Sequence, residues 1–370
     1  MQQFLTRLFA RLMKSWSWVL LIGLVIFIKW ASIYPDWIEK NYTYGIYPVI
    51  SRIQRFLFGW IPFSIGDLFY AFLILVIIFK TIQFFKLMFK KKLTRKYFIT
   101  GLQQIIFFFL FVYVFFNLLW GLNYNRMGIA NQLDLNLKKY SLADLDTLAG
   151  AIQNKLNKYA PLVNEAQRDT FDKKKILFNE SFLAFKAATN RYPFLKYKTK
   201  SVKPSLFSYA GNYLGFQGYY NPFSGEGQVN TTIPRFLEPY VTMHEIAHQV
   251  GYAKENEANF VAFLVGHTYE SDIFRYSLYF DIYAYSIREI WKRDSVLAKE
   301  YNKKLHSQVI KDVNTYREFY EKYENPVEPV IMWLYGNYLK ANNQPMGKET
   351  YNEVVALLIA YYKKYGIESL

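Results

Sequence analysis

The feature that most constrains this chain is a stretch of 29 residues, 97–125, that contains no charged side chain. The centre of the stretch reads IIFFFLFVYVFFNLLW. A helix of roughly 20 apolar residues is long enough to cross the hydrocarbon core of a bilayer. The sequence therefore predicts a transmembrane helix at about 99–121.

Two other apolar segments predict two more spans. Residues 16–33 begin with tryptophans and carry Lys29 near their far end, where its long side chain can reach the interface. Residues 63–79 are apolar except for Asp67 near one end. Because no small-residue cleavage site follows the first segment, we interpret it as a span and not as a signal peptide. We expect a membrane domain of three transmembrane helices over residues 1–125.

Positive charge is concentrated in this apolar third of the chain. Residues 1–126 contain 15 Lys and Arg against three acidic residues, whereas the other 244 residues contain 30 against 26. Such a distribution is typical of contact with a lipid bilayer, so nucleic acid is not an expected partner. Arg7 and Arg11 precede the first span, and a lysine-rich linker at 80–96 joins the second and third. The positive-inside rule therefore predicts a cytoplasmic N-terminus and an extracytoplasmic domain at 126–370, in a multi-pass protein of the plasma (inner) membrane.

Two features of the membrane domain leave alternatives open. Apolar residues from Ile46 to Leu57 recur at helical spacing and predict an amphipathic helix, which lies either in the outer interface or against the C-terminal domain. Asp67 is either a functional acid within the membrane or, as we favour, a residue at headgroup depth near the outer end of the second span.

The remaining residues, 126–370, have an ordinary composition and predict one domain dominated by helices. Residues 203–234 are rich in Gly, Asn and Pro, which predicts short strands and turns. The expected fold class is α+β, mostly α. Helices are expected at 141–159, 165–190, from 236 through the segment that ends at 250, and at 271–293, 295–323, 326–339 and 349–365.

One motif in this domain carries chemistry. His244-Glu-Ile-Ala-His248 is an HExxH sequence within a segment that reads as helical. The i, i+4 spacing places both imidazoles on one helix face, at a separation that suits a single metal ion. Glu245 lies beside them, where it can act as a general base on water at the metal. Since the chain contains no Cys, any metal must be held by His and carboxylate groups.

A third protein ligand is expected just after this helix. Gly251 can end the helix, and Glu255 and Glu257 follow it. Two positions along a helix differ in direction by about 200°, so only one of the two acids can face the metal. Glu255 shares its face with small residues that allow close packing, which favours it as the ligand and leaves Glu257 as the alternative. Asn259 is expected to support a ligating His from outside the metal's own ligand set.

The run HEIAHQVGYAKENEANF resembles the gluzincin pattern, in which HExxH is followed by a helix that bears the third ligand. The chain is most similar to an uncharacterised family of bacterial multi-span membrane proteins, whose outer domain carries this run after a GYYNPFSGE-like stretch, here Tyr219–Glu226. The resemblance implies a zincin-like metallohydrolase domain. Two departures from better-known gluzincins are the short interval of seven residues between His248 and Glu255 and the presence of Asn259 in place of Asp.

The ligand set of two His and one Glu suits one Zn²⁺ per chain. The resemblance also implies that residues 215–233 supply an edge strand that binds an extended peptide by β-augmentation, although the same residues could form an ordinary hairpin. His267 and His306 stand without a metal-spaced partner and are expected to be structural. A donor to the tetrahedral oxyanion is expected among Tyr219, Tyr220, Arg235 and Tyr335.

These features together predict a membrane-anchored zinc metallopeptidase that hydrolyses peptide bonds at the outer face of the membrane. One alternative is a catalytically inactive zincin-fold protein that serves as an envelope scaffold or partner-binding module. Another is a metallohydrolase of a non-peptide envelope amide or ester. The enzyme is favoured because a scaffold has no physical reason to retain Glu245.

Overall fold

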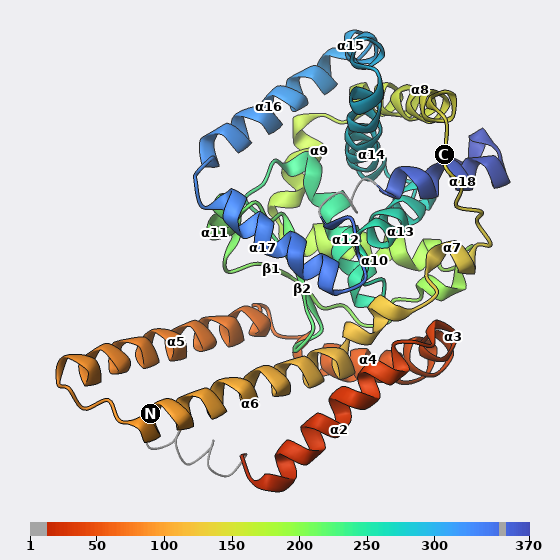
Figure 1. Ribbon diagram of the computed structural model, residues 1–370. Coiled ribbons are helices and arrows are strands. Elements are labelled where there is room, and N and C mark those ends of the chain that lie inside the picture. Colours follow the sequence, from red (N-terminus) through yellow and green to blue (C-terminus); the bar gives the residue numbers. More distant parts are fainter. Residues whose placement is uncertain (1–12, 348–352) are drawn as a thin grey trace.

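The computed structural model describes residues 13–347 and 353–370, so Arg7, Arg11 and the first four residues of the helix expected at 349–365 lie outside the described part. The described chain is mostly helical and contains one sheet of three short strands (Figure 1), in agreement with the predicted class. With the labels of Figure 1, its helices and strands are α2 (Ser15–Ala31), α3 (Pro35–Trp37), a π-helix (Ile38–Ile46), α4 (Tyr47–Phe58), α5 (Ile65–Phe89), α6 (Arg95–Leu119), α7 (Ile129–Gln132), α8 (Leu142–Tyr159), α9 (Glu165–Asp169), α10 (Lys174–Ala188), β1 (Val202–Pro204), α11 (Ser208–Leu214), β2 (Gly218–Asn221), β3 (Glu226–Val229), α12 (Glu238–Gln249), α13 (Glu255–Thr268), α14 (Asp272–Arg293), α15 (Ser295–Lys303), α16 (Ser307–Tyr323), α17 (Glu328–Ala341) and α18 (Val354–Tyr365).

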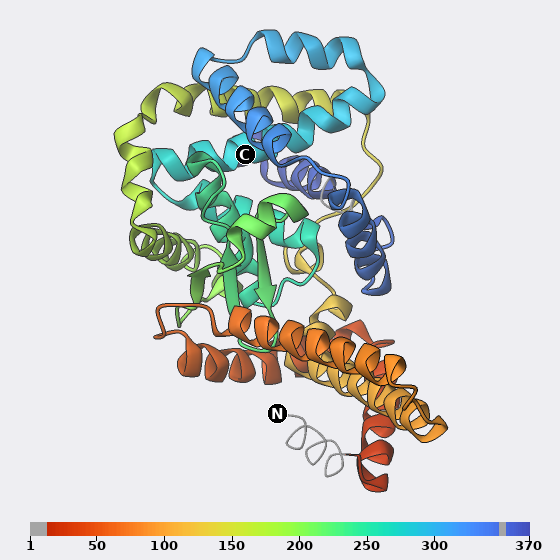
Figure 2. The ribbon, with the colours of Figure 1, turned by 90° about the vertical axis from the view of Figure 1, so that its left-hand side faces the viewer.

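Two of these helices, α5 and α6, are long and apolar enough to cross a membrane. They run side by side away from the C-terminal part of the chain (Figures 1 and 2). α2 packs on α6, where the ring of Trp18 lies 5.2 Å from that of Phe107. A bend of 106° separates α2 from the segment Pro35–Phe58. If α2 and this segment together form one span, it is the third. The described chain thus has two or three helices able to span a bilayer.

The second apolar helix is longer than the predicted span at 63–79. α5 continues to Phe89 and includes Lys80 and Lys86, which the sequence prediction assigns to the linker. A lysine can be accommodated in an apolar helix because its alkyl stem lies along the helix while its ammonium group reaches water. The connection between α5 and α6 is therefore shorter than predicted.

The amphipathic helix predicted between Ile46 and Leu57 is present as α4 and has two distinct faces. Its polar face, with Ser51 and Arg55, is buried against the C-terminal part of the chain. Its apolar face remains exposed, through Val49, Ile53, Phe56 and Leu57, and Ile46 just before the helix is exposed too. Contact with the C-terminal part is therefore made by the polar side chains, and the apolar face is left for another environment.

Two acidic groups join the beginning of α5 to the sheet. Glu226 accepts a hydrogen bond from the backbone N–H of Gly66 at 2.7 Å, and Asp67 accepts one from that of Leu206 at 2.7 Å. Tyr219 in β2 also donates to Asp67. Carboxylates are favoured at a helix N-terminus, where N–H groups lack partners within the helix. Asp67 is therefore a buried structural contact in the first turn of α5.

The sheet has the order β1-β3-β2, with β3 parallel to β1 and antiparallel to β2. Helix α12 packs across it, because Gly227 in β3 has no side chain and a Cβ there would lie 3.1 Å from the Cβ of Glu245. The strands and turns predicted at 203–234 are present, but this region also contains helix α11, which its turn-rich composition hides.

The C-terminal part is a stack of helices in which α8 packs along α14, and α12 along α13. α8 begins as predicted, with a capping box between Ser141 and Asp144. Two segments that are each predicted as one continuous helix are divided into two helices. The segment at 165–190 is divided into α9 and α10, because Lys173 adopts a non-helical ψ of 85°. The segment at 295–323 is divided into α15 and α16, because His306 caps the start of α16.

Candidate metal centre

The two histidines of the HExxH motif lie on one face of α12, as their spacing predicts. Both side chains are buried, and their Nε2 atoms are 3.1 Å apart. After the helix, Gly251 adopts a φ of +97°, a conformation that favours glycine and reverses the chain toward α13. The first residue of α13 is Glu255, so this turn brings its carboxylate back over the two imidazoles.

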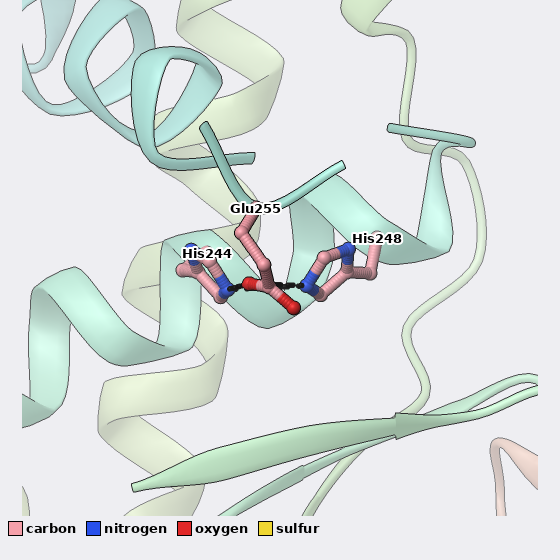
Figure 3. A group of neighbouring side chains, drawn as sticks. All are labelled: His244, His248 and Glu255. Atoms are coloured by element: carbon pink, nitrogen blue, oxygen red, sulfur yellow. Dashed lines mark hydrogen bonds and ion pairs between the residues drawn. The ribbon is translucent and has the colours of Figure 1, made fainter. Parts of the chain in front are cut away.

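The three side chains converge on a common point (Figure 3). Glu255 Oε2 lies 3.1 Å from Nε2 of His244 and 3.6 Å from Nε2 of His248. All three ligand atoms lie within 4.8 Å of one another. Glu255 Oε1 accepts a hydrogen bond of 2.6 Å from Tyr335 in α17, which leaves Oε2 directed at the histidines without a hydrogen-bond partner.

The outer nitrogens of both rings are held by oxygen acceptors. His244 Nδ1 lies 2.8 Å from Oδ1 of Asn259, and His248 Nδ1 lies 2.6 Å from the carbonyl oxygen of Tyr252. A ring nitrogen that faces such an acceptor must carry the proton, so in a neutral imidazole Nε2 presents a lone pair. Asn259 therefore supports a histidine in the way that the sequence predicts.

This arrangement fits a metal ion. Two lone pairs and a carboxylate oxygen meet in a buried volume with no donor between them, which is unfavourable unless a cation joins them. A proton is the other cation that could do so. Burial opposes protonation of His248, but the charge of Glu255 outweighs it and raises the pKa of His248 to about 9. Elemental analysis of the purified protein distinguishes a bound metal ion from a bound proton, because it detects only the metal ion.

Glu245 lies next to the cluster and is also buried. Its neighbour across the sheet is Gly218 in β2, where a Cβ would lie 2.4 Å from Glu245 Oε1. Oε2 of Glu245 has no hydrogen-bond partner among the described residues. Burial raises the pKa of Glu245 to about 8. The carboxyl group therefore has a pKa close to neutral pH and is available to exchange a proton.

The alternative ligand, Glu257, points elsewhere. Its Oε1 would clash with a Cβ at Gly128 and lies 3.9 Å from Nζ of Lys254. Because it projects from a different side of α13, it does not join the group formed by Glu255 and the two histidines.

The four candidate oxyanion donors are dispersed. Tyr335 contacts Glu255 at the site, and Tyr219 also lines the cavity but is bonded to Asp67. Tyr220 is buried against Trp120, at a ring distance of 4.9 Å. Arg235 pairs with two aspartates in a half-exposed position away from the cavity.

The two other histidines outside the motif have structural partners. His267 Nδ1 lies 2.9 Å from the Tyr279 hydroxyl, and burial lowers the pKa of His267 to about 4. His306 caps α16. Neither joins a metal-ligand group in the described chain.

The cluster opens into a cavity of about 580 Å³. Its walls come from β2 and the preceding loop and from helices α12, α13, α14, α16 and α17. Sequence reasoning named none of the lining residues that α14 and α16 contribute, which are Asp281, Ala284, Tyr285, Arg288, Tyr316 and Tyr320. The four residues of α14 are spaced i, i+3, i+4 and i+7, so they share one helix face, and this spacing could have identified that part of the wall.

The end of the HExxH helix is held by the apolar N-terminal part of the chain. The carbonyl oxygen of Gln249 accepts hydrogen bonds from Tyr47, Ser51 and Arg55 of α4. The indole N–H of Trp120 donates to the carbonyl of His248 at 3.1 Å. These donors satisfy carbonyls that have no partner within the helix, so segments distant in sequence fix the position of His248.

We expect the stability of the folded chain to depend on pH through Asp281. Burial raises the pKa of Asp281 from 3.8 to about 8. Between these values the unfolded chain has lost this proton and the folded chain retains it, so stability falls as pH rises, by up to about 1.4 kcal/mol per pH unit. Asp281→Asn removes this effect. The thermal midpoint of the variant, minus that of the native chain, is therefore expected to increase from pH 5 to pH 8. A constant difference would contradict the assignment.

The fold and the site define a class of protein. Its described part is mostly helical, with two or three helices able to span a membrane and a buried His-His-Glu cluster able to hold a metal ion. Within this class, residues 42–359 match the family described as "Protein of unknown function (DUF3810)", and the chain belongs to that family. The matched region includes His244, His248 and Glu255. No curated protein and no solved structure matches the chain.

Proposed function

We propose that this chain is a membrane-anchored zinc metallopeptidase that hydrolyses peptide bonds at the outer face of the membrane. The observation that carries the proposal is the convergence of His244, His248 and Glu255, with Glu245 beside them, at the wall of one cavity. This donor set is the one used in zinc sites that keep one position open for water or substrate. We assign residues 126–370 to a zincin-like domain on the same grounds.

In this proposal the three clustered side chains hold one Zn²⁺. The bound ion would polarise the peptide carbonyl and lower the pKa of water. Glu245 accepts the proton of the attacking water on Oε2 and then delivers it to the nitrogen of the leaving amine. Burial raises the pKa of Glu245, which favours a carboxyl group that can hold the proton between these two steps. Tyr335 and Asn259 hold the ligands in place through Glu255 and His244.

An extended peptide would bind along β2. This strand pairs only with β3 in the described sheet, and Gly218 and Tyr219 line the cavity. A strand edge of this kind can add a peptide through backbone hydrogen bonds. Since Gly218 has no side chain, the peptide backbone could approach Glu245 closely at that position.

The membrane orientation in this proposal has α5 and α6, with α2, as spans and the N-terminus in the cytoplasm. The basic turn between α5 and α6 lies at the end of these helices farthest from the C-terminal part of the chain (Figure 1). This position supports an orientation in which the turn and the C-terminal part lie on opposite sides of the membrane. The exposed apolar face of α4 would then lie in the outer interface.

The first test is the metal content of the full-length protein, purified without chelators and analysed by elemental mass spectrometry. We expect about one zinc per native chain and almost none in His248→Ala, because loss of one of three ligands removes most of the affinity. Arg235→Met, which alters a half-exposed pair away from the cavity, is the control and should retain zinc. If native protein contained no stoichiometric metal, the hydrolase proposal would be wrong and a membrane scaffold would replace it.

A further inference from the structure

The end of the cavity formed by α14 and α16 has a distinct chemistry. α14 contributes Asp281 and Tyr285, which are one turn apart on the same face. α16 contributes Tyr316 and Tyr320, also one turn apart, with ring centroids separated by 4.7 Å. Tyr240 of α12 completes the wall. One carboxyl group thus shares this end of the cavity with four tyrosine rings, and its charge acts on all four.

Asp281 makes no polar contact that links it to another described part of the fold. Neither of its carboxyl oxygens forms a hydrogen bond or an ion pair with a described residue, and Oδ2 is buried. Burial alone accounts for the raised pKa of Asp281, so no cation among the described residues offsets the loss of hydration. An unpaired carboxylate in such a position is unfavourable, so the free folded chain keeps Asp281 protonated. A ligand with a positive charge would favour the ionised carboxylate and pair with it.

The surrounding tyrosines suit the same ligand. Burial, together with the charges of Asp281 and of neighbouring tyrosines, raises the pKa of Tyr240, Tyr285 and Tyr316, so their rings remain neutral phenols at physiological pH. The Tyr320 hydroxyl accepts a hydrogen bond from Gln217 at 3.0 Å. Neutral aromatic faces attract ammonium and guanidinium groups through cation–π interactions.

This end of the cavity is continuous with the metal centre but displaced from it. Tyr240 and Tyr285 feel the charges of both Asp281 and Glu255. Tyr240 precedes His244 by one turn of α12, and α12 packs against α14, which carries Tyr285. These two tyrosines therefore join the metal centre to the end of the cavity that Tyr316 and Tyr320 of α16 line. A side chain next to a cleaved bond could extend along this path while its backbone stays at the metal.

Arg288 is the one basic residue that lines the described cavity, and it does not neutralise Asp281. It follows Asp281 by two turns of α14 and is exposed. The guanidinium group makes no ion pair with a described residue, and it is not among the causes of the Asp281 pKa. Arg288 therefore stays hydrated at the cavity mouth, and Asp281 is left for a ligand.

From this arrangement we infer that Asp281 and the tyrosines around it bind a basic side chain, Lys or Arg, of a peptide substrate. The inference rests on the proposed peptidase function and names the substrate class of the same site. Asp281 supplies the opposite charge, Tyr240 and Tyr285 line the path from the metal centre, and Tyr316 and Tyr320 form the far wall.

The test measures peptide binding to zinc-loaded, full-length Glu245→Gln protein in detergent, by fluorescence anisotropy. The probes are fluorescein-labelled alanine hexapeptides with one lysine at each position in turn, each paired with a twin that has norleucine there. We expect lysine to improve the Kd at least about tenfold at one position. That preference should disappear in E245Q/D281N and persist in E245Q/D281E. The charge-matched control, E245Q/E318Q, removes an exposed carboxylate of α16 outside the cavity and should retain it.

Two outcomes overturn the inference: no lysine preference at any position, or a preference that survives Asp281→Asn. The thermal midpoint of each variant is measured alongside. Asn is nearly isosteric with a protonated Asp, so D281N is expected to fold. D281E provides a second variant, which changes the side chain at this position but keeps its carboxyl group. Failure of the proposed function is a separate result. If the native chain cleaved no peptide but lysine binding still depended on Asp281, the basic-residue site would stand and the peptidase would not.

Discussion

Replacing Glu245 by glutamine is expected to abolish peptide hydrolysis while leaving one zinc per chain. Glutamine has nearly the shape of glutamate, so it fits beside Gly218, where there is no room for a larger group. It has no carboxylate to accept a proton from water. General acid–base groups contribute about 10²–10⁴-fold to catalysis, and a loss of at least that size is expected. The measurement is kcat/KM with a peptide substrate, beside zinc content by elemental mass spectrometry.

His248→Ala provides the comparison for this variant, because it should lose zinc and activity together. Full activity in Glu245→Gln would show that Glu245 is not the base. Loss of both activity and zinc would show that Glu245 supports the metal centre instead of acting on the substrate. The combination of retained metal and lost turnover is the result that supports the proposed mechanism.

The second large effect is expected from Arg126→Met. The Arg126 guanidinium donates to Glu39 at 2.9 Å and to the carbonyl of Gly251 at 3.0 Å, and it lies 4.5 Å from the ring of Tyr252. Methionine fills part of the space but leaves the Glu39 carboxylate without its cation. Removal of one partner from a buried ion pair costs about 3–5 kcal/mol, which corresponds to a fall in thermal midpoint on the order of 10 °C.

Arg235→Met is the matched control for this measurement. The Arg235 side chain is 42% exposed and also pairs with acidic residues, Asp169 and Asp172. Exposed ion pairs contribute no more than about 1 kcal/mol to the free energy of unfolding, so the thermal midpoint of Arg235→Met should change by only a few degrees. Equal shifts for the two variants in thermal unfolding of the detergent-solubilised protein would show that the Arg126 pair has no special role. Arg126 also holds the turn before Glu255, so its loss should weaken zinc binding as well.

Much of the metal centre could be predicted because its spacing is local. The two histidines share a helix, and Gly251 and Glu255 follow within seven residues. The preference for Glu255 over Glu257 came from the periodicity of one helix, and the structure brings Glu255 to the histidines. By contrast, the breaks at Lys173 and His306 depend on packing and capping that a periodic pattern does not reveal.

The division at residue 125 stays a prediction, and the structure shows how closely the two sides are joined. Trp120 and α4 cap the end of α12, and Asp67 and Glu226 fix the start of α5 to the sheet. Each contact joins residues more than 100 positions apart. No local pattern could have predicted which polar residues of the apolar third face the site.

The sequence by itself determined the apolar helices, the mostly helical class and the three clustered metal-site residues, because each follows from periodicity or spacing within about 30 residues. Only the tertiary structure decided the cavity, with Asp281 and its tyrosines, and the supports at Gln249 and His248. The physical reason is that a buried polar group acquires its role from partners that the folded chain brings together from distant segments. Asp281 shows the distinction most clearly. In the sequence it is one acid among 29, and in the fold it is a carboxyl group that no described residue pairs, in the cavity that opens from the metal centre.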